Sequence, residues 1–240
     1  MSDGTAAVTQ MPMPMPMPIP IPMPMPLPTS ASASAAAAVA SARVIRAAEC
    51  RSMPWKNGAG ATTEICVHPP GAGLDDFGWR VSMATVAGDG PFSVFAGVDR
   101  TLTLLAGDGL RLEIGDAAPV LLGRDSAPLS FPADVPTRST LIGSPVTDLN
   151  VMTRRGAWRH AVTRQVFEGG ARQVAEQQTT APTVLWFCRL GDLKITCPSG
   201  EVRLRPGDSW LVEQLIPSTW RVTSDLADLF LIEIEPDLKR

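Results

Sequence analysis

Tyrosine is absent from this 240-residue chain, and histidine occurs only twice, as His68 and His160. The absence of tyrosine excludes catalysis by a phenol. Metal-dependent β-barrel enzymes usually bring two or three histidines and a carboxylate to one place. Because the two histidines lie far apart in the sequence and His68 precedes two prolines, we expect neither a metal site nor a cofactor.

Cysteine is also scarce, with Cys50, Cys66, Cys188 and Cys197 and no C-x-x-C pair among them. A disulfide scaffold of this length would need more cysteines. We therefore interpret the four as buried thiols in a reducing compartment and predict a cytoplasmic protein. No G-x-S-x-G motif is present, so nothing supports a Ser-His-Asp hydrolase.

Charge is low as well, with a formal net charge of −3 and a sequence pI of about 5.4. This balance argues against a nucleic-acid groove or an anionic-membrane patch as the main function. The hydrophobic fraction of 45% is enough for a core, and the length suits one large domain or two small ones. The partners we expect are a small-molecule metabolite and a second copy of the chain in a homodimer.

Residues 1–42 have a different composition from the rest. Met11 to Pro28 alternates proline with Met, Ile or Leu, and an Ala/Ser tract follows. Proline at every second position favours an extended, polyproline-II-like chain and excludes a transmembrane helix. No Lys or Arg precedes Arg43, so a secretory cationic region is missing. We expect a disordered tail or an over-extended start; a docking segment for a proline-binding partner is the alternative.

From Arg43 onward, short strand-like runs alternate with turn residues such as Gly107-Asp108-Gly109 and Pro206-Gly207-Asp208. No 3.6-residue stripe extends beyond about ten residues, although Gly169–Gln178 could form a short helix. Many short strands at this spacing predict an all-β sandwich or barrel.

An internal echo supports a repeat. Gly107–Leu112 resembles Gly191–Ile195, and the closing strand Asp148–Met152 resembles Asp228–Ile232. Two such units predict a double-barrel arrangement within 43–240, with the second barrel at roughly 185–236. Asn150 in the first copy corresponds to Phe230 in the second, so we expect a polar ligand site in the first barrel and an apolar second one.

The most informative stretch is Met53–Ile65, which combines an aromatic, a cation, an amide, two glycines and a carboxylate. Its glycines permit a turn or a close approach, and Thr62–Val67 then alternates like a strand. A polar loop would thus present Lys56, Asn57 and Glu64 to a cavity. The alternative is a glycine-rich surface turn.

Three further stretches carry polar residues. In Phe77–Ala84, alternation puts Arg80 and Ser82 on the opposite strand face from Trp79, Val81 and Met83. In Asp89–Arg100, Phe92 and Phe95 suit a core, and Asp99 or Arg100 could join a rim ion pair. In Thr147–Arg155, Asp148, Asn150 and Met152 share one face, where an Asp–Asn pair would orient a ligand; an amphipathic edge strand is the alternative.

In order, these segments read W-K-N-G-x-G-x-T-x-E-I, W-R-x-S-x-A, D-G-P-F-S-x-F-x-G-x-D-R and D-L-N-V-M-x-R-R, and they resemble the HutD/Ves family from about Arg43 to Pro236. Ala59 stands where the family usually has glycine, and Thr63 where it usually has arginine. The resemblance implies an all-β, double-barrel (bicupin, RmlC-like) β-sandwich architecture without metal ligands, behind a disordered N-terminal tail. It also implies a link to bacterial histidine-utilisation operons and, for a related branch, to environmental stress.

The family pattern implies a small-molecule-binding regulator rather than an enzyme. Its ligand would be a small carboxylate or imidazole-pathway metabolite, with the carboxylate held by Arg80 or Lys56. Two alternatives remain open: a metal-free isomerase or hydrolase with Glu64 or Asp148 as general base and Lys56 as acid, and a protein-interaction module docked through the tail. The expected ligand-binding residues are Trp55, Lys56, Asn57, Glu64, Trp79, Arg80, Ser82, Ser93, Arg100, Asp148, Asn150 and Arg154.

Overall fold

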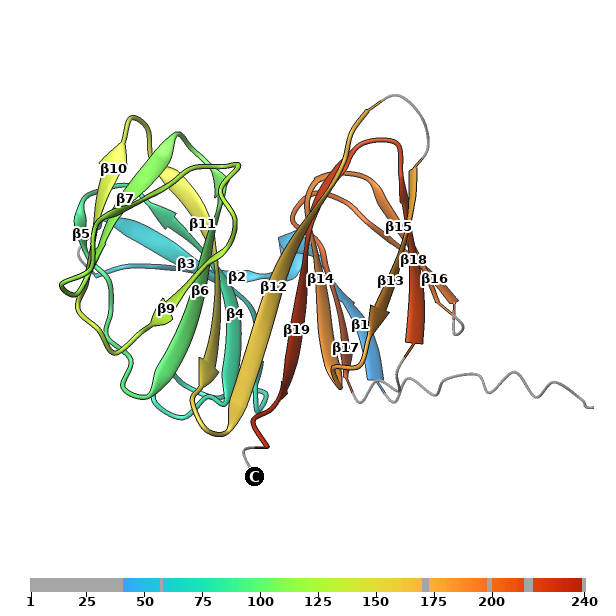
Figure 1. The fold of residues 1–240 in the computed structure, drawn as a ribbon, viewed down its shortest axis with the longest axis horizontal. Helices are drawn as coiled ribbons and strands as arrows, with labels where there is room; N and C mark the ends of the chain where they lie inside the picture. The colour runs from blue at the N-terminus through green and yellow to red at the C-terminus, as the bar shows by residue number, and fades with distance from the viewer. Residues whose placement is uncertain (1–40, 57, 170–172, 198–199, 214–217, 239–240) are drawn as a thin grey trace, which may run out of the picture. The chain divides into compact units, whose positions relative to one another are not determined.

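The computed structural model describes residues 41–56, 58–169, 173–197, 200–213 and 218–238. These residues form nineteen β-strands and a single short 3-10 helix, η1 (Ala47–Glu49) (Figure 1). The prediction of an all-β fold is confirmed. Among the described residues, no helix has the length and apolar character needed to cross a membrane.

Strands β2 to β11 form two sheets, which we call the N-half. The six-stranded sheet has the order β2-β3-β4-β11-β6-β9 and the four-stranded sheet the order β5-β10-β7-β8. The bounds in the first sheet are β2 (Arg51–Pro54), β3 (Gly60–His68), β4 (Trp79–Val86), β11 (Val146–Arg154), β6 (Val98–Ala106) and β9 (Leu129–Pro132). Those in the second are β5 (Gly90–Pro91), β10 (Thr137–Ile142), β7 (Gly109–Ile114) and β8 (Val120–Leu122).

Strands β12 to β19, together with β1, form two more sheets, the C-half. The five-stranded sheet has the order β1-β17-β14-β19-β12, and the four-stranded sheet the order β13-β18-β15-β16. The bounds in the first are β1 (Ser41–Ile45), β17 (Ser209–Glu213), β14 (Thr183–Gly191), β19 (Ala227–Pro236) and β12 (Trp158–Phe167). Those in the second are β13 (Gln173–Thr179), β18 (Ser218–Ser224), β15 (Leu193–Cys197) and β16 (Gly200–Leu204).

Alternation along the strands divides the core into separate layers. Leu102, Leu104, Leu110 and Leu112 are fully buried between the two sheets of the N-half. A second cluster packs the outer face of the six-stranded sheet against the five-stranded sheet; it contains Trp79, Val81, Leu149, Val151, Leu185, Phe187, Phe230 and Ile232. The interior of the C-half is a third cluster, which includes Trp186, Trp210 and Trp220. Each half is thus a β-sandwich with its own core.

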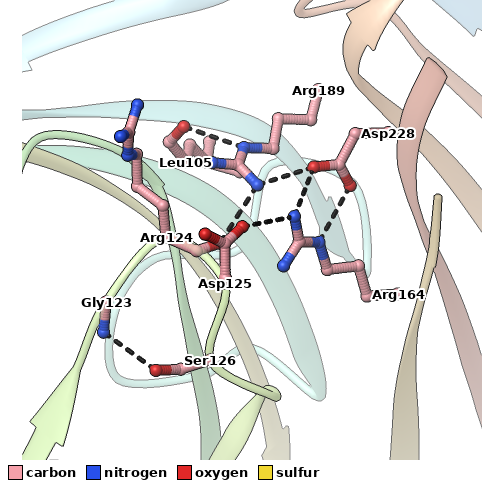
Figure 2. A network of polar contacts seen from close by, with 8 residues as sticks. All are labelled: Leu105, Gly123, Arg124, Asp125, Ser126, Arg164, Arg189 and Asp228. Carbon is pink, nitrogen blue, oxygen red and sulfur yellow. Dashed lines mark hydrogen bonds and ion pairs between the residues drawn. The ribbon is translucent and has the colours of Figure 1, made fainter. Parts of the chain in front are cut away.

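A polar network also joins the two halves (Figure 2). Asp228 on β19 accepts hydrogen bonds from Arg164 on β12 and from Arg189 on β14, at 2.8 and 2.6 Å. Arg189 also donates to the carbonyl oxygens of Leu105 and Arg124 in the N-half, at 2.9 and 3.1 Å. Because Asp228 is only 5% exposed, its charge depends on both arginines for compensation.

The predicted boundaries need correction. Strand β1 starts at Ser41, within the segment that we assigned to the tail, and it pairs with β17 of the C-half. Apart from β1, the strands of the C-half begin at Trp158, earlier than residue 185. Each half has two separate sheets whose described strands do not close into one continuous ladder, so the barrel prediction is only partly met. The predicted disorder of residues 1–40 lies outside the described residues.

Two local predictions are wrong. The described part of Gly169–Gln178 contains strand β13, which pairs with β18 along its whole length, so pairing overrides the helix propensity of its Gln, Glu and Ala residues. The predicted structural correspondence between Asn150 and Phe230 is also wrong. Phe230 packs between the halves, whereas Leu229 and Leu231 fill the C-half interior. The C-half interior is nevertheless apolar, as expected.

Candidate functional site

The glycine-rich segment forms a tight turn before β3. Trp55 N–H donates to the Gly60 carbonyl at 2.8 Å, and Gly58, with a φ of +70°, donates back to the Trp55 carbonyl at 3.0 Å. A Cβ at Gly60 would lie 2.1 Å from the Thr85 carbonyl oxygen and 2.9 Å from the Trp55 ring. The turn therefore lets the Trp55 ring pack on the N-half core, where its Nε1 donates to Thr62 Oγ1 at 2.8 Å.

Polar side chains from the central strands of the six-stranded sheet point into the N-half interior. The register places Ser82 of β4 opposite both Glu64 of β3 and Asn150 of β11, while Arg80 and Arg100 flank Met152. These residues alternate with Val81, Leu149 and Val151, which face the other half. The interior set, which we call the polar cluster, is Glu64, Arg80, Ser82, Arg100, Asp148 and Asn150.

Arg80 is held on two sides within the polar cluster. Its Nε donates to Glu64 Oε2 at 2.8 Å, and its Nη1 donates to Ser82 Oγ at 3.1 Å. The Arg80 side chain is 6% exposed and that of Glu64 33%, so the ion pair marks the boundary between interior and solvent. Glu64 therefore neutralises Arg80, as a buried guanidinium requires.

Asp148 is the most deeply buried acid of the cluster, with 1% exposure. Asn150 Nδ2 donates to its Oδ1, whereas Oδ2 has no hydrogen-bond partner. Burial raises the pKa of the Asp148 carboxyl to about 7, although the charge of Arg100, the Asn150 hydrogen bond and the Ala84 backbone lower it. The carboxyl thus titrates near neutral pH.

Arg100 is 5% exposed and is surrounded by aromatic rings. Its guanidinium carbon lies 5.3, 5.5 and 5.9 Å from the ring centres of Phe92, Phe95 and Phe131. Its Nη2 donates to the Ser93 carbonyl at 3.3 Å and contacts Met152 Sδ at 3.6 Å, but its Nε has no partner. Burial lowers the pKa of Arg100 to about 10, with Asp148 raising it and Arg80 lowering it. The guanidinium is positioned without a bidentate carboxylate partner.

Five of the predicted residues that the structure describes do not join the polar cluster, and Trp55 is one of them, because its ring packs on the N-half core. Trp79 faces the other half, where it stacks on His68, and Lys56 is exposed. Arg154 binds the carbonyl oxygens of Phe77 and Asp75, and it fixes that loop. Ser93 has an exposed side chain and contributes only its carbonyl. Asn57 lies outside the described residues.

The aromatic residues around Arg100 were not among the predicted site residues. The sequence predicts only a core position for Phe92 and Phe95, and it gives no signal for Phe131. The alternation of β9 and its position next to β6 place Phe131 opposite Arg100. That pairing is long-range, and no local signal in the sequence shows it. The position of Thr62 near the site was predictable, because Thr62 lies two residues before Glu64 in the same strand and so shares its face.

The two histidines have different partners in the structure. His68 lies 5.4 Å from the Trp79 ring and 5.2 Å from the Trp158 ring, centre to centre. His160 bonds Thr101 Oγ1 and Thr153 Oγ1, both at 2.8 Å, and burial lowers its pKa to about 4. Within the described ranges, no three side chains of His, Cys, Asp or Glu gather as metal ligands would.

Comparisons with known proteins identify close relatives. The HutD family model matches residues 47–227. An uncharacterised 21.2 kDa protein from the hutC 3′ region of Pseudomonas putida is 35% identical over 162 residues, which cover 67% of this chain and 80% of that protein. Protein Ves of Citrobacter koseri is 46% identical over 111 residues, which cover 45% of this chain and 56% of Ves.

Solved structures agree with these matches. A conserved protein of unknown function from Pseudomonas aeruginosa PAO1 is 32% identical with a TM-score of 0.74, covering 81% of this chain and 99% of its own. HutD from Pseudomonas fluorescens SBW25, in a formate condition, is 30% identical with a TM-score of 0.71, covering 82% and 99%. Protein Ylba of E. coli, 8% identical with a TM-score of 0.62 over 85% of this chain and 95% of its own, shares the fold alone.

Proposed function

Because the chain belongs to the HutD family, we propose that it is a metal-independent small-molecule-binding protein, a sensor or regulator linked to histidine catabolism. Its ligand is a small carboxylate or imidazole-pathway metabolite, bound by the polar cluster of the N-half. The position of the Pseudomonas putida relative beside hutC supports the pathway link. In this proposal the two sandwich halves correspond to the two barrels of a bicupin, and only the first binds ligand.

The proposal rests on two buried atoms that lack hydrogen-bond partners, one a donor and the other an acceptor. Arg100 Nε, a donor, and Asp148 Oδ2, an acceptor, are both buried without a hydrogen-bond partner. A buried polar group left unpaired costs about 1–3 kcal/mol. Other buried unpaired atoms of the described residues, such as the indole nitrogens of Trp186 and Trp220, belong to neutral side chains, whereas these two belong to ionisable groups. A small ligand with an acceptor oxygen and a polar hydrogen satisfies both.

Arg100 replaces Arg80 and Lys56 as the carboxylate-binding residue. The guanidinium of Arg80 is already bound by Glu64 and Ser82, and Lys56 is exposed. The rings of Phe92, Phe95 and Phe131 fix the orientation of Arg100, so little side-chain entropy is lost when a ligand binds.

Calorimetric titration of the full chain tests this function. The ligands are formate, acetate, glutamate, urocanate, histidine and formiminoglutamate, each with and without EDTA. We expect at least one carboxylate to bind equally with EDTA, and a ligand at 100 times its Kd to stabilise the fold by about 2.7 kcal/mol. Arg100→Met should abolish binding, because it removes the donor and the charge but keeps the length of the side chain.

The matched control is Arg138→Met, which changes an exposed arginine of the same half and should bind as the wild type does. Unchanged binding by Arg100→Met, or binding that EDTA removes, would contradict the proposal. Absence of binding by every ligand would remove the histidine-pathway ligand set altogether.

A second candidate function is a metal-free isomerase or hydrolase. It is favoured by the buried Asp148 carboxyl, whose pKa of about 7 suits a general base at neutral pH. Glu64 is the weaker candidate because Arg80 binds it. Sustained heat after each injection in the same titrations, lost in Asp148→Asn, would favour the enzyme; binding heat alone favours the sensor.

A further inference from the structure

Resting on the proposed ligand site, we propose that this site binds its carboxylate ligand together with one proton, which Asp148 Oδ2 holds and donates to the ligand. The ligand class is thereby narrowed to small carboxylate anions. A cationic imidazolium group, which has two N–H donors and no acceptor, would instead need an ionised Asp148.

The hydrogen bonds of Asp148 leave one place for that proton. Asn150 Nδ2 donates to Oδ1 and occupies it as an acceptor. Oδ2 is buried and has no partner. A proton on Oδ2 makes the carboxyl a donor directed at an acceptor, and a ligand carboxylate supplies one. The other orphan atom, Arg100 Nε, donates to the same anion.

The charges around Asp148 require the proton when an anion arrives. Arg100 on β6 is the charged group that acts on Asp148. Arg80 on β4 acts on Arg100, and its ion pair with Glu64 on β3 offsets its charge. The four-stranded sheet opposite contributes neutral buried side chains, namely Leu110, Leu112, Thr137 and Ser139. Thr137 and Ser139 hydroxyls already donate to carbonyl oxygens.

One guanidinium is therefore left to balance Asp148. A bound carboxylate adds a second negative charge in the same buried space. Two carboxylates that share a site cannot both remain ionised, and the pKa of one is raised strongly. The bound anion therefore shifts Asp148 to its protonated form, and the two carboxyl groups share the proton.

The pH dependence follows from this linkage. In the free protein burial raises the pKa of Asp148 to about 7, so below neutral pH the carboxyl is already protonated and binding takes up almost no proton. Above pH 7 each binding event must take up about one proton, and the affinity for the anion falls about tenfold per pH unit. An imidazolium ligand, which needs the ionised carboxyl, would instead lose affinity below pH 7.

The experiment is calorimetric titration of the full chain with acetate and formate from pH 6 to pH 9, in pairs of buffers that differ in ionisation enthalpy. We expect uptake of about 0.1 proton at pH 6 and about 0.9 at pH 8. Asp148→Asn should bind acetate with equal affinity across the range, because the amide mimics the protonated acid. Asp116→Asn, an exposed aspartate of the same half, should keep the wild-type slope.

The possible outcomes distinguish a failure of this inference from a failure of the proposed function on which it rests. Acetate that binds without proton uptake, or a slope that persists in Asp148→Asn, overturns the inference and leaves the ligand site standing. If neither acetate nor formate binds, this inference is overturned, and the function is overturned with it only if the four larger ligands of the first titration fail to bind as well. Proton uptake by the wild-type protein does not depend on any variant. It therefore tests the inference even if Asp148→Asn folds poorly.

Discussion

Asp148 in the N-half interior and Asp228 at the contact between the halves are both almost fully buried, at 1% and 5% exposure, yet their partners differ. Asp228 accepts hydrogen bonds from two arginines, Arg164 and Arg189, which in turn contact the N-half. Asp148 has no arginine bonded to it: the Asn150 amide donates to Oδ1, the Ala84 backbone also favours the charged carboxyl, and Oδ2 has no hydrogen-bond partner. Burial alone therefore does not distinguish the two acids: Asp228 has charged partners and joins the two halves, whereas Asp148 keeps an unpartnered oxygen that the proposed ligand would use.

The interiors of the two halves repeat this contrast. The C-half is filled by Trp186, Trp210, Trp220, Leu229 and Leu231, whereas the N-half keeps the polar cluster beside its leucines. The apolar core of the C-half stabilises the fold, and this half also pairs with β1. The N-half buries polar groups in its interior, which lowers its stability.

The largest effect in this comparison should come from Asp228→Ala. It removes the buried carboxylate that Arg164 and Arg189 share, which leaves Arg189 with only carbonyl partners and Arg164 with only the exposed Asp125. Breaking such a buried pair typically destabilises by about 3–5 kcal/mol. Urea unfolding of the full chain measures the loss. Asp125→Ala removes the exposed partner of Arg164 and should cost less than about 1 kcal/mol. Equal losses in the two variants would refute the distinction.

A smaller effect of opposite sign is expected from Asp148→Asn. The pKa of Asp148 is raised to about 7 in the folded state, so the folded state binds the proton more tightly than the unfolded chain. Wild-type stability from this group is therefore present at low pH and is lost as pH rises toward 7. The variant lacks this loss, so its stability relative to wild type should increase by roughly 2 kcal/mol from pH 5 to pH 8. A difference in stability between variant and wild type that stays constant across that range would show that burial does not raise the pKa of Asp148.

Much of the site could be predicted from the sequence because β-strands alternate. Trp79–Val86 is a strand with the predicted bounds, and Arg80 and Ser82 share one face as expected. The shared face of Asp148 and Asn150 is confirmed as well. These predictions needed only the two-residue period of a strand.

The remaining features depend on contacts that the local sequence does not encode. The ring of Phe131 reaches Arg100 through the pairing of β9 with β6, and β1 joins β17 across most of the chain. The echo between the halves misplaced Phe230 because a slip of one residue turns every side chain to the other face. Trp79 was included from the family pattern although its own alternation put it on the face opposite Arg80.

The most direct test of a ligand site in the polar cluster is the nitrogen-15 spectrum of the Arg100 Nε–H group during titration of the full chain with acetate. Arg100→Met assigns the resonance, and the group has no acceptor in the free protein. We predict that its signal shifts and becomes protected from solvent exchange as acetate saturates the site, while the Arg80 Nε–H, already bound to Glu64, changes little. Acetate binding that leaves the Arg100 signal unchanged would contradict a ligand site in the polar cluster.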